Sequence, residues 1–167
     1  MLTLAKTGVR RGELLDMEVH DIDIENMQIR LKKKRKRSRD IVYFDEELKE
    51  VLIKYLEYWN DYAKNTSYLW LNKYYNNKMN KDRVNEIIGL HAEKLGYHDP
   101  NGPLENRVTA HCFRHFYTTE LYKAGMDPEF IKYLRGDSLE KESWQIYNHI
   151  NPQRVRDDYL NRIPALL

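Results

Sequence analysis

Apolar residues repeated at helical spacing, each series preceded by a residue that can cap a helix, are the feature that most constrains the fold of this chain. Asp45 precedes one series, whose stripe is Leu48, Val51, Leu52, Tyr55, Leu56 and Trp59. Asn80 precedes another, which ends at Gly96 and whose stripe is Val84, Ile87, Ile88, Ala92 and Leu95. Recurrence at i, i+3, i+4 and i+7 is typical of a helix that buries one face. We therefore predict two amphipathic helices.

Three further helix starts are visible in the second half of the chain. Thr109 precedes a segment predicted to run as a helix over about 110–124, with Gly125 as its stop. Asp127-Pro128 and Asn151-Pro152 each combine a capping side chain with a proline in the first turn, where the missing N–H costs nothing. Most of the chain is therefore expected to be helical.

The pattern changes between Met17 and Phe44. Residues 28–31 and 41–44 have the composition of short strands, and a run of cations separates them. We predict a β-hairpin that carries this charge. The predicted fold class is therefore mainly α with a small antiparallel β-sheet (α+β). A chain of 167 residues suffices for one sizeable core, so 1–167 is expected to be a single domain.

The run of cations is the anomaly in the charge distribution. The chain has a net charge of only +2, yet residues 30–39 hold eight cations and no acid. Most charge runs are solvated faces, but cations crowded on one hairpin repel one another, and a polyanion that neutralises them releases counterions. We favour contact with the backbone of double-stranded DNA, made by Lys32, Lys33, Arg35, Lys36, Arg37 and Arg39.

Several classes of protein are disfavoured by simple counts. Cys112 is the single cysteine, which excludes an internal disulfide and a multi-cysteine zinc site. No apolar stretch approaches the roughly 18 residues that span a bilayer, and no signal peptide is visible. The expectation is a cytoplasmic protein that associates with DNA and not with a membrane.

Two pairs of reactive residues share the spacing i, i+3. His111 and Arg114 are predicted to project from one helix face toward one phosphate, and Arg10 and Glu13 have the same spacing, so that the carboxylate can orient a basic neighbour. The alternative for Arg10 and Glu13 is a surface ion pair. The alternatives for His111 are a hydrogen-bonded helix histidine or, with His115, a two-histidine metal face. No metal ligand is predicted, because a zinc protease would require His-Glu-x-x-His and Arg114 would repel the ion.

These residues, with a tyrosine near the end of the chain, resemble the motifs of the tyrosine recombinase, or phage integrase, family. The matching residues are Thr7, Gly8, Val9, Arg10, Glu13, Leu14, His111, Arg114, His115, Tyr147, Asn148 and His149. The family's lysine lies in a hairpin turn, which corresponds here to Lys34, with Lys33 and Lys36 close enough to be confused with it. The resemblance covers nearly the whole chain.

The resemblance implies a reaction and a set of roles. Tyr147 would attack a DNA phosphate to give a 3′-phosphotyrosyl link, and Lys34 would protonate the leaving 5′ oxygen. Arg10 and Arg114, with His111, would bind the non-bridging oxygens, for which the planar, permanently charged guanidinium is well suited. Neither a metal nor another cofactor is implied. The family's partners are double-stranded DNA and further copies of the protein, four protomers exchanging strands on two paired sites.

One position departs from the family pattern. Relatives usually carry a histidine or tryptophan shortly before the nucleophile, whereas this chain has Asp137, one residue farther from Tyr147. An ionised aspartate would repel a phosphate unless it is protonated or paired with Arg114 or Arg135. We hypothesise that Asp137 orients an arginine or accepts a proton from Tyr147.

The resemblance also bears on the ends of the chain and leaves alternatives. Family members carry an N-terminal domain that closes around the DNA, so this chain is expected to be a C-terminal catalytic fragment. A final helix, with Val155, Tyr159 and Leu160 on one side, either packs on its own domain or docks on a neighbouring protomer. Two other functions stay open, a topoisomerase-like enzyme and a non-catalytic DNA-binding relative.

Overall fold

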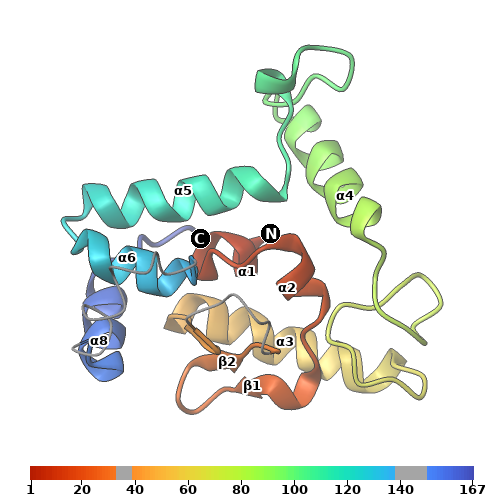
Figure 1. Cartoon of the computed structure of the whole chain (residues 1–167). Helices are drawn as coiled ribbons and strands as arrows, with labels where there is room; N and C mark the ends of the chain where they lie inside the picture. The colour runs from red at the N-terminus through yellow and green to blue at the C-terminus, as the bar shows by residue number, and fades with distance from the viewer. Residues whose placement is uncertain (33–38, 138–149) are drawn as a thin grey trace.

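The computed structural model describes residues 1–32, 39–137 and 150–167 and is dominated by helices (Figure 1). The helices are α1 (Leu2–Thr7), α2 (Arg11–Leu15), α3 (Glu46–Tyr62), α4 (Lys81–Lys94), α5 (Ala110–Lys123), α6 (Pro128–Arg135) and α8 (Pro152–Arg162), with 3-10 turns at Val19–Asp21 and Leu104–Asn106. The strands are β1 (Ile22–Asp23), β2 (Gln28–Arg30) and β3 (Ile41–Tyr43). The predicted class, mainly α with a small antiparallel sheet, is confirmed.

The predicted helix starts are confirmed by their capping hydrogen bonds. The side chains of Asp45, Asn80, Thr109, Asp127 and Asn151 each accept a backbone N–H from the first turn of the helix that follows. A cap of this kind stabilises a helix by about 1 kcal/mol. These short-range hydrogen bonds fix where each helix begins.

The predicted apolar stripes are right for most of their length and wrong at two positions. Leu48 and Leu52 of α3, and Val84 and Ile88 of α4, are buried. Val51 is 36% exposed, because it precedes Leu52 by one residue and so lies about 100° around the helix from it.

Leu95 is the second exception. It is 70% exposed, because α4 ends at Lys94 and the chain then turns away through Gly96, whose φ is +76°.

The predicted hairpin is present as part of a larger sheet. Strands β2 and β3 pair antiparallel with Ile29 opposite Val42, and the additional strand β1 pairs with the other edge of β2. Ile29 and Val42 are both buried, so one face of the sheet packs into the core with α3. The sequence did not predict β1, which is only two residues long.

Helix α1 lies between α5 on one side and the layer of α3 and the sheet on the other (Figure 1). Two groups of buried residues hold these layers together. Leu4, Ile29 and Leu48 belong to the first, while Tyr117 of α5 and Tyr159 of α8 belong to the second. The N-terminal helix is therefore enclosed, and the loop that follows it is held at the junction of α2, α4 and α5.

The end of the chain packs on its own domain in this structure. Lys6 is completely buried, and its Nζ donates to Asp45 Oδ2 at 2.5 Å and to the Pro164 carbonyl oxygen at 2.6 Å. The backbone N–H groups of Leu166 and Leu167 both donate to Glu47. Of the two arrangements considered for the tail, the one on its own domain is observed.

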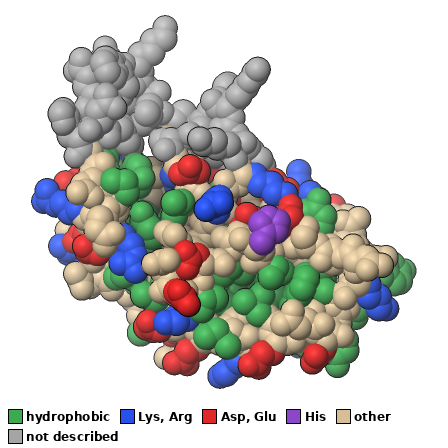
Figure 2. Space-filling view, turned by 90° about the horizontal axis from the view of Figure 1, so that it is seen from below, with side chains coloured by type: hydrophobic (Ala, Val, Ile, Leu, Met, Phe, Trp, Pro, Cys, Tyr) green, Lys and Arg blue, Asp and Glu red, His purple; other side chains and the backbone are tan. Residues whose placement is uncertain are grey.

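The surface mixes the two signs of charge. Figure 2 shows basic and acidic side chains interspersed over the described part of one face, as expected when 28 cations meet 26 carboxylates. Among the described residues, no helix has both the length and the apolar character needed to cross a membrane.

Candidate active site

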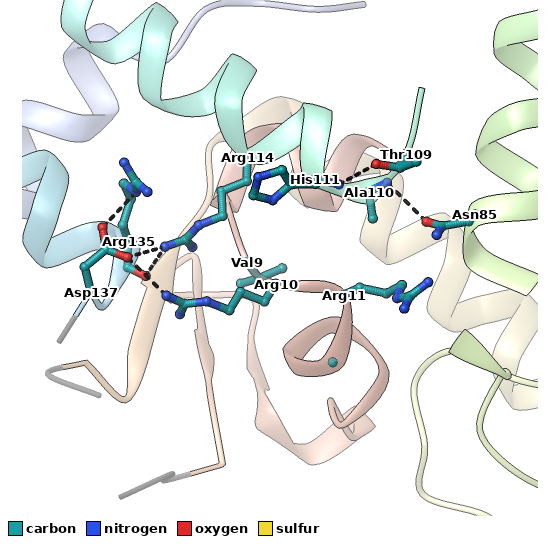
Figure 3. A pocket seen from close by; sticks show the side chains of 11 residues that line it. Val9, Arg10, Arg11, Asn85, Thr109, Ala110, His111, Arg114, Arg135 and Asp137 are labelled. Carbon is teal, nitrogen blue, oxygen red and sulfur yellow. Dashed lines mark hydrogen bonds and ion pairs between the residues drawn. The ribbon is translucent and has the colours of Figure 1, made fainter. Parts of the chain in front are cut away.

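A cavity of about 500 Å³ lies where the α1–α2 loop meets the starts of α4 and α5 and the end of α6 (Figure 3). Its lining residues are Val9, Arg10, Arg11, Gly12, Asn85, Thr109, Ala110, His111, Arg114, Arg135 and Asp137. Arg10 from one predicted motif, and His111 and Arg114 from a second motif far along the chain, line it together. The cavity is thus lined by an excess of cations.

The loop that carries Arg10 has a defined conformation. Gly8 ends α1 with φ +59°, and a Cβ there would lie 2.4 Å from Cδ1 of Tyr117. A non-glycine residue would therefore face both backbone strain and a steric clash. Arg10 follows in extended conformation as the N-cap of α2, where its backbone N–H donates to Glu13 Oε2 at 2.6 Å.

Glu13 also supports the Arg10 side chain, as the i, i+3 spacing predicted. Its Oε1 lies 3.6 Å from Arg10 Nη1. Glu13 is buried, so the alternative of a surface ion pair is wrong. The carboxylate is placed to orient cations from inside the domain.

Arg114 is fixed by backbone carbonyls on two sides. Its Nη1 donates to the Gly8 carbonyl oxygen at 2.7 Å, and its Nη2 donates to the Arg135 carbonyl oxygen at 2.8 Å. Burial, and then the positive charge of Arg10, lowers the pKa of Arg114, while Asp137 opposes this shift. The guanidinium is held rigidly at the wall of the cavity.

Asp137 pairs with arginines, as one of the hypotheses from sequence proposed. Its Oδ1 lies 2.8 Å from Arg114 Nη2 and 3.1 Å from Arg10 Nη2, and its Oδ2 lies 3.0 Å from Arg135 Nε. Figure 3 shows Arg10 and Arg114 extending side by side toward this carboxylate. The two arginines therefore converge on one anionic group.

His111 is hydrogen-bonded to the second histidine of its helix. His111 Nε2 lies 2.9 Å from His115 Nε2, and the two rings are nearly perpendicular, at 86°. One ring must donate and the other accept, so their tautomers are linked. Among the described residues, no three His, Cys, Asp or Glu side chains are grouped as a metal ion would require.

The structure differs from the sequence prediction at Arg39. Its side chain is 1% exposed and packs inside the domain, with Nη2 3.7 Å from Glu13 Oε2. Within the described part of the chain, its three guanidinium nitrogens have no hydrogen-bond partner. Burial lowers the pKa of Arg39 to about 10, although Glu13 opposes the shift. Gly136 makes room for it, because a Cβ there would lie 2.8 Å from Arg39 Cγ. In this structure Arg39 is a buried cation and does not face solvent, where a DNA backbone would be met.

Lys32, at the other end of the basic run, is exposed, as contact with DNA would require. Its Nζ pairs with Glu18, and this hydrogen bond is the main reason that the pKa of Lys32 is raised. Two segments, 33–38 and 138–149, hold the remaining predicted residues. The first contains Lys33, Lys34, Arg35, Lys36 and Arg37, and the second contains Ser138, Tyr147, Asn148 and His149. All of these fall outside the described residues.

Two lining residues were not foreseen. Asn85 Oδ1 accepts the backbone N–H of Ala110 at 3.2 Å and so links α4 to the start of the helix that carries His111. Arg11 points away from Asp137 and donates to the Lys81 carbonyl oxygen at 3.3 Å (Figure 3). Arg11 occupies an unspecified position of the motif at 7–14 and Asn85 lies outside the motifs, so the sequence held no signal for either.

Comparison with known proteins adds a family. The model of the phage integrase family matches residues 1–154. The chain is 27% identical over 161 residues to tyrosine recombinase XerC of Leptospira interrogans, covering 96% of this chain and 49% of that protein. It is 28% identical to tyrosine recombinase XerA of Saccharolobus solfataricus, covering 97% of this chain and 48% of that protein. The chain thus spans about half the length of these relatives.

Solved structures give the same fold. The crystal structure of XerA recombinase superposes with a TM-score of 0.72 at 26% identity, covering 98% of this chain and 57% of that one. The Tn1549 transposon integrase in complex with transposon right end DNA gives a TM-score of 0.67 at 20% identity, covering 94% and 56%. At 20% identity, the similarity to the Tn1549 integrase shows a shared fold and nothing more.

Proposed function

This chain belongs to the phage integrase family, and on that premise we propose that it cleaves and rejoins DNA strands in site-specific recombination. The observation that carries the proposal is the convergence of Arg10 and Arg114. Their Nη2 atoms lie 3.1 and 2.8 Å from one carboxylate oxygen, that of Asp137. In the sequence, Arg10 is 127 positions and Arg114 is 23 positions from this aspartate. Two guanidinium groups aimed at one point form an anion site with the right geometry for a phosphodiester.

The proposed first step is a transesterification. The Tyr147 hydroxyl attacks phosphorus and loses its proton, the bond from phosphorus to the 5′ oxygen breaks, and that oxygen takes a proton from a lysine. The product is a 3′-phosphotyrosyl link and a free 5′ hydroxyl. We propose Lys34 as the acid, with Lys33 and Lys36 as the alternatives.

The arginines stabilise the charge that develops in this step. Arg10 and Arg114 bind the non-bridging oxygens of the phosphate, and His111 donates a further hydrogen bond from the same cavity. Glu13 holds Arg10 in position through the contacts described above. Rejoining reverses the step when a 5′ hydroxyl attacks the phosphotyrosine, so the proposed chemistry invokes no metal or nucleotide cofactor.

The proposed partner is double-stranded DNA, bound in part through Lys32 and the cations of 33–38. Several family neighbours, including XerH bound to difH substrate, were solved with DNA. We further propose that four protomers assemble on two paired sites, and that the protein acts in the cytoplasm. The expectation of an additional N-terminal DNA-clamping domain stays a prediction.

The experiment that tests the function is a search for the covalent intermediate. The protein is incubated with a labelled pool of nicked duplexes of random sequence, and adducts are separated on a denaturing gel. An adduct is expected with the natural chain and with Tyr122→Phe, which changes an exposed tyrosine of α5, but not with Tyr147→Phe. An adduct that persists in Tyr147→Phe contradicts the assignment of the nucleophile.

The same experiment separates the alternatives. Tight, salt-sensitive binding without any adduct would favour a non-catalytic DNA-binding protein. An adduct accompanied by relaxation of supercoiled DNA without paired sites would favour a topoisomerase-like enzyme. Family membership favours neither.

A further inference from the structure

The carboxylate of Asp137 occupies the point at which Arg10 and Arg114 converge. It is a singly charged group whose two adjacent oxygens contact guanidinium nitrogens on three arginines. A bound phosphodiester would present the same charge and a similar pair of oxygens. We propose that Asp137 is an internal substitute for the DNA phosphate, which fills the anion site in the DNA-free protein and is displaced when a phosphodiester binds.

The hydrogen bonds of one nitrogen of Arg114, Nη2, favour this exchange. Each terminal nitrogen of a guanidinium carries two hydrogens. Those of Arg114 Nη2 are used by the Arg135 carbonyl oxygen and by Asp137 Oδ1. The Arg135 carbonyl belongs to the last residue of α6, whereas Asp137 lies beyond the helix. A phosphate oxygen that binds Nη2 therefore replaces the aspartate.

The fold brings Asp137 to this position by a fixed turn. Gly136 caps α6 in the left-handed conformation, with φ +60°, and packs against the buried side chain of Arg39. Because a Cβ at Gly136 would collide with Arg39 and φ is positive there, this turn requires glycine. The next residue, Asp137, lines the cavity, and its side chain is 34% exposed there.

Because both are anions, Asp137 and a phosphate compete for Arg10 and Arg114. Two anions cannot share a half-buried site without repulsion, so an ionised Asp137 opposes any phosphate that approaches Arg10 and Arg114. A free anion has only these contacts to offer. A DNA strand also gains phosphate contacts along its backbone, and these can offset the displacement of Asp137. Free small anions therefore bind the site weakly, whereas a DNA strand can displace Asp137 from it. The identity of the displacing anion rests on the proposed function.

The test measures binding of inorganic phosphate, which needs neither DNA nor the nucleophile. Phosphate is titrated by calorimetry at constant ionic strength into the natural chain, Asp137→Asn and Asp61→Asn. The last variant removes the same charge from an exposed position at the end of α3. We expect Asp137→Asn to bind phosphate about ten-fold more tightly or better. Asp61→Asn should match the natural chain.

A purely structural role for Asp137 predicts the opposite sign. If the aspartate only holds Arg10 and Arg114 in place, its loss disperses them and phosphate binding weakens. Unchanged or weaker binding in Asp137→Asn overturns the proposal. Asp137→Ser gives the same comparison if the asparagine variant does not fold, and adding Arg10→Lys to either variant should remove the gain.

The outcome is independent of the covalent-adduct experiment. A tenfold gain in phosphate affinity with no adduct from any variant would support the proposal that Asp137 takes the place of the phosphate, and would count against recombinase activity. An adduct from the natural chain, without a gain in phosphate affinity in Asp137→Asn, would support the activity. It would overturn only the proposal that Asp137 takes the place of the phosphate.

Discussion

The Arg114 guanidinium donates to the Gly8 carbonyl oxygen at 2.7 Å, joining residues 106 positions apart. The bond ties the helix that carries His111 and Arg114 to the loop that carries Arg10. It depends on the left-handed conformation of Gly8, which directs that carbonyl toward α5. The geometry of the cavity therefore depends on a residue that is not among its lining residues.

Gly8→Ala tests that dependence. The substitution places a methyl group against the Tyr117 ring and forces an alanine to φ +59°, so we expect the free energy of unfolding to fall by about 2–4 kcal/mol. Urea denaturation measures the change. Gly12→Ala is the matched control, because Gly12 lies in α2 with open space at its Cβ position, and alanine there should be neutral or stabilise by up to about 1 kcal/mol. Equal stability of the two variants would contradict this account.

Arg10→Lys tests the charge-stabilising role without removing the charge. A lysine cannot contact both Asp137 and Glu13 from one planar group, so we expect the single-turnover rate of adduct formation to fall about 100-fold or more while the fold is retained. Arg11→Lys changes a neighbour that points away from Asp137 and should change the rate less than about three-fold. Similar losses from both variants would argue against a specific role for Arg10.

Alkaline pH should destabilise the domain through its buried tyrosines. Burial raises the pKa of Tyr117 and of Tyr159, and raises that of Tyr55 to about 12. Above about pH 10 the unfolded chain releases these protons and the folded chain keeps them, so stability falls as pH rises. Arg39, whose pKa burial lowers to about 10, and Arg114, whose pKa burial also lowers, have the opposite effect, but burial raises the pKa of Tyr43 and Tyr133 as well, so the tyrosines outnumber the arginines.

The expected slope is about 1.4 kcal/mol per pH unit for each fully buried tyrosine, less the same amount for Arg39. Urea midpoints at about pH 9 and about pH 11 measure it. Tyr117→Phe should make the slope shallower, whereas Tyr97→Phe, which changes an exposed tyrosine, should leave it unaltered. A Tyr117→Phe slope equal to that of the natural chain would show that this hydroxyl titrates normally in the folded state.

Lys6→Met tests what holds the end of the chain. Removing the buried cation leaves Asp45 and Glu47 without their ion-pair partner, so we expect a loss of about 3 kcal/mol and faster amide exchange at Leu166. Hydrogen exchange followed by NMR measures the second effect. Lys54→Met, at an exposed position of α3, should change neither quantity. Unaltered exchange at Leu166 in Lys6→Met would mean that Glu47 holds the tail unaided.

Much of the fold and part of the site could be predicted because the determining interactions are short in sequence. Caps such as Asp45 and Asn151 bond to N–H groups two or three residues ahead, and the spacing of Leu48 and Leu52 reflects one helical turn. The pairing of His111 with Arg114 on one helix face has the same origin. The family motifs then linked these residues to Arg10.

By itself the sequence determined three things: the starts of the helices, the two short strands on either side of the basic run, and the residue types that meet at the site. Tertiary structure alone decided that Arg39 is buried beside Glu13, that Asp137 lies between Arg10 and Arg114, and that the tail packs on Lys6. The physical reason is one of range. A cap or a helical stripe is complete within a few residues, whereas the environment of a charge depends on which distant segments surround it once the chain has folded.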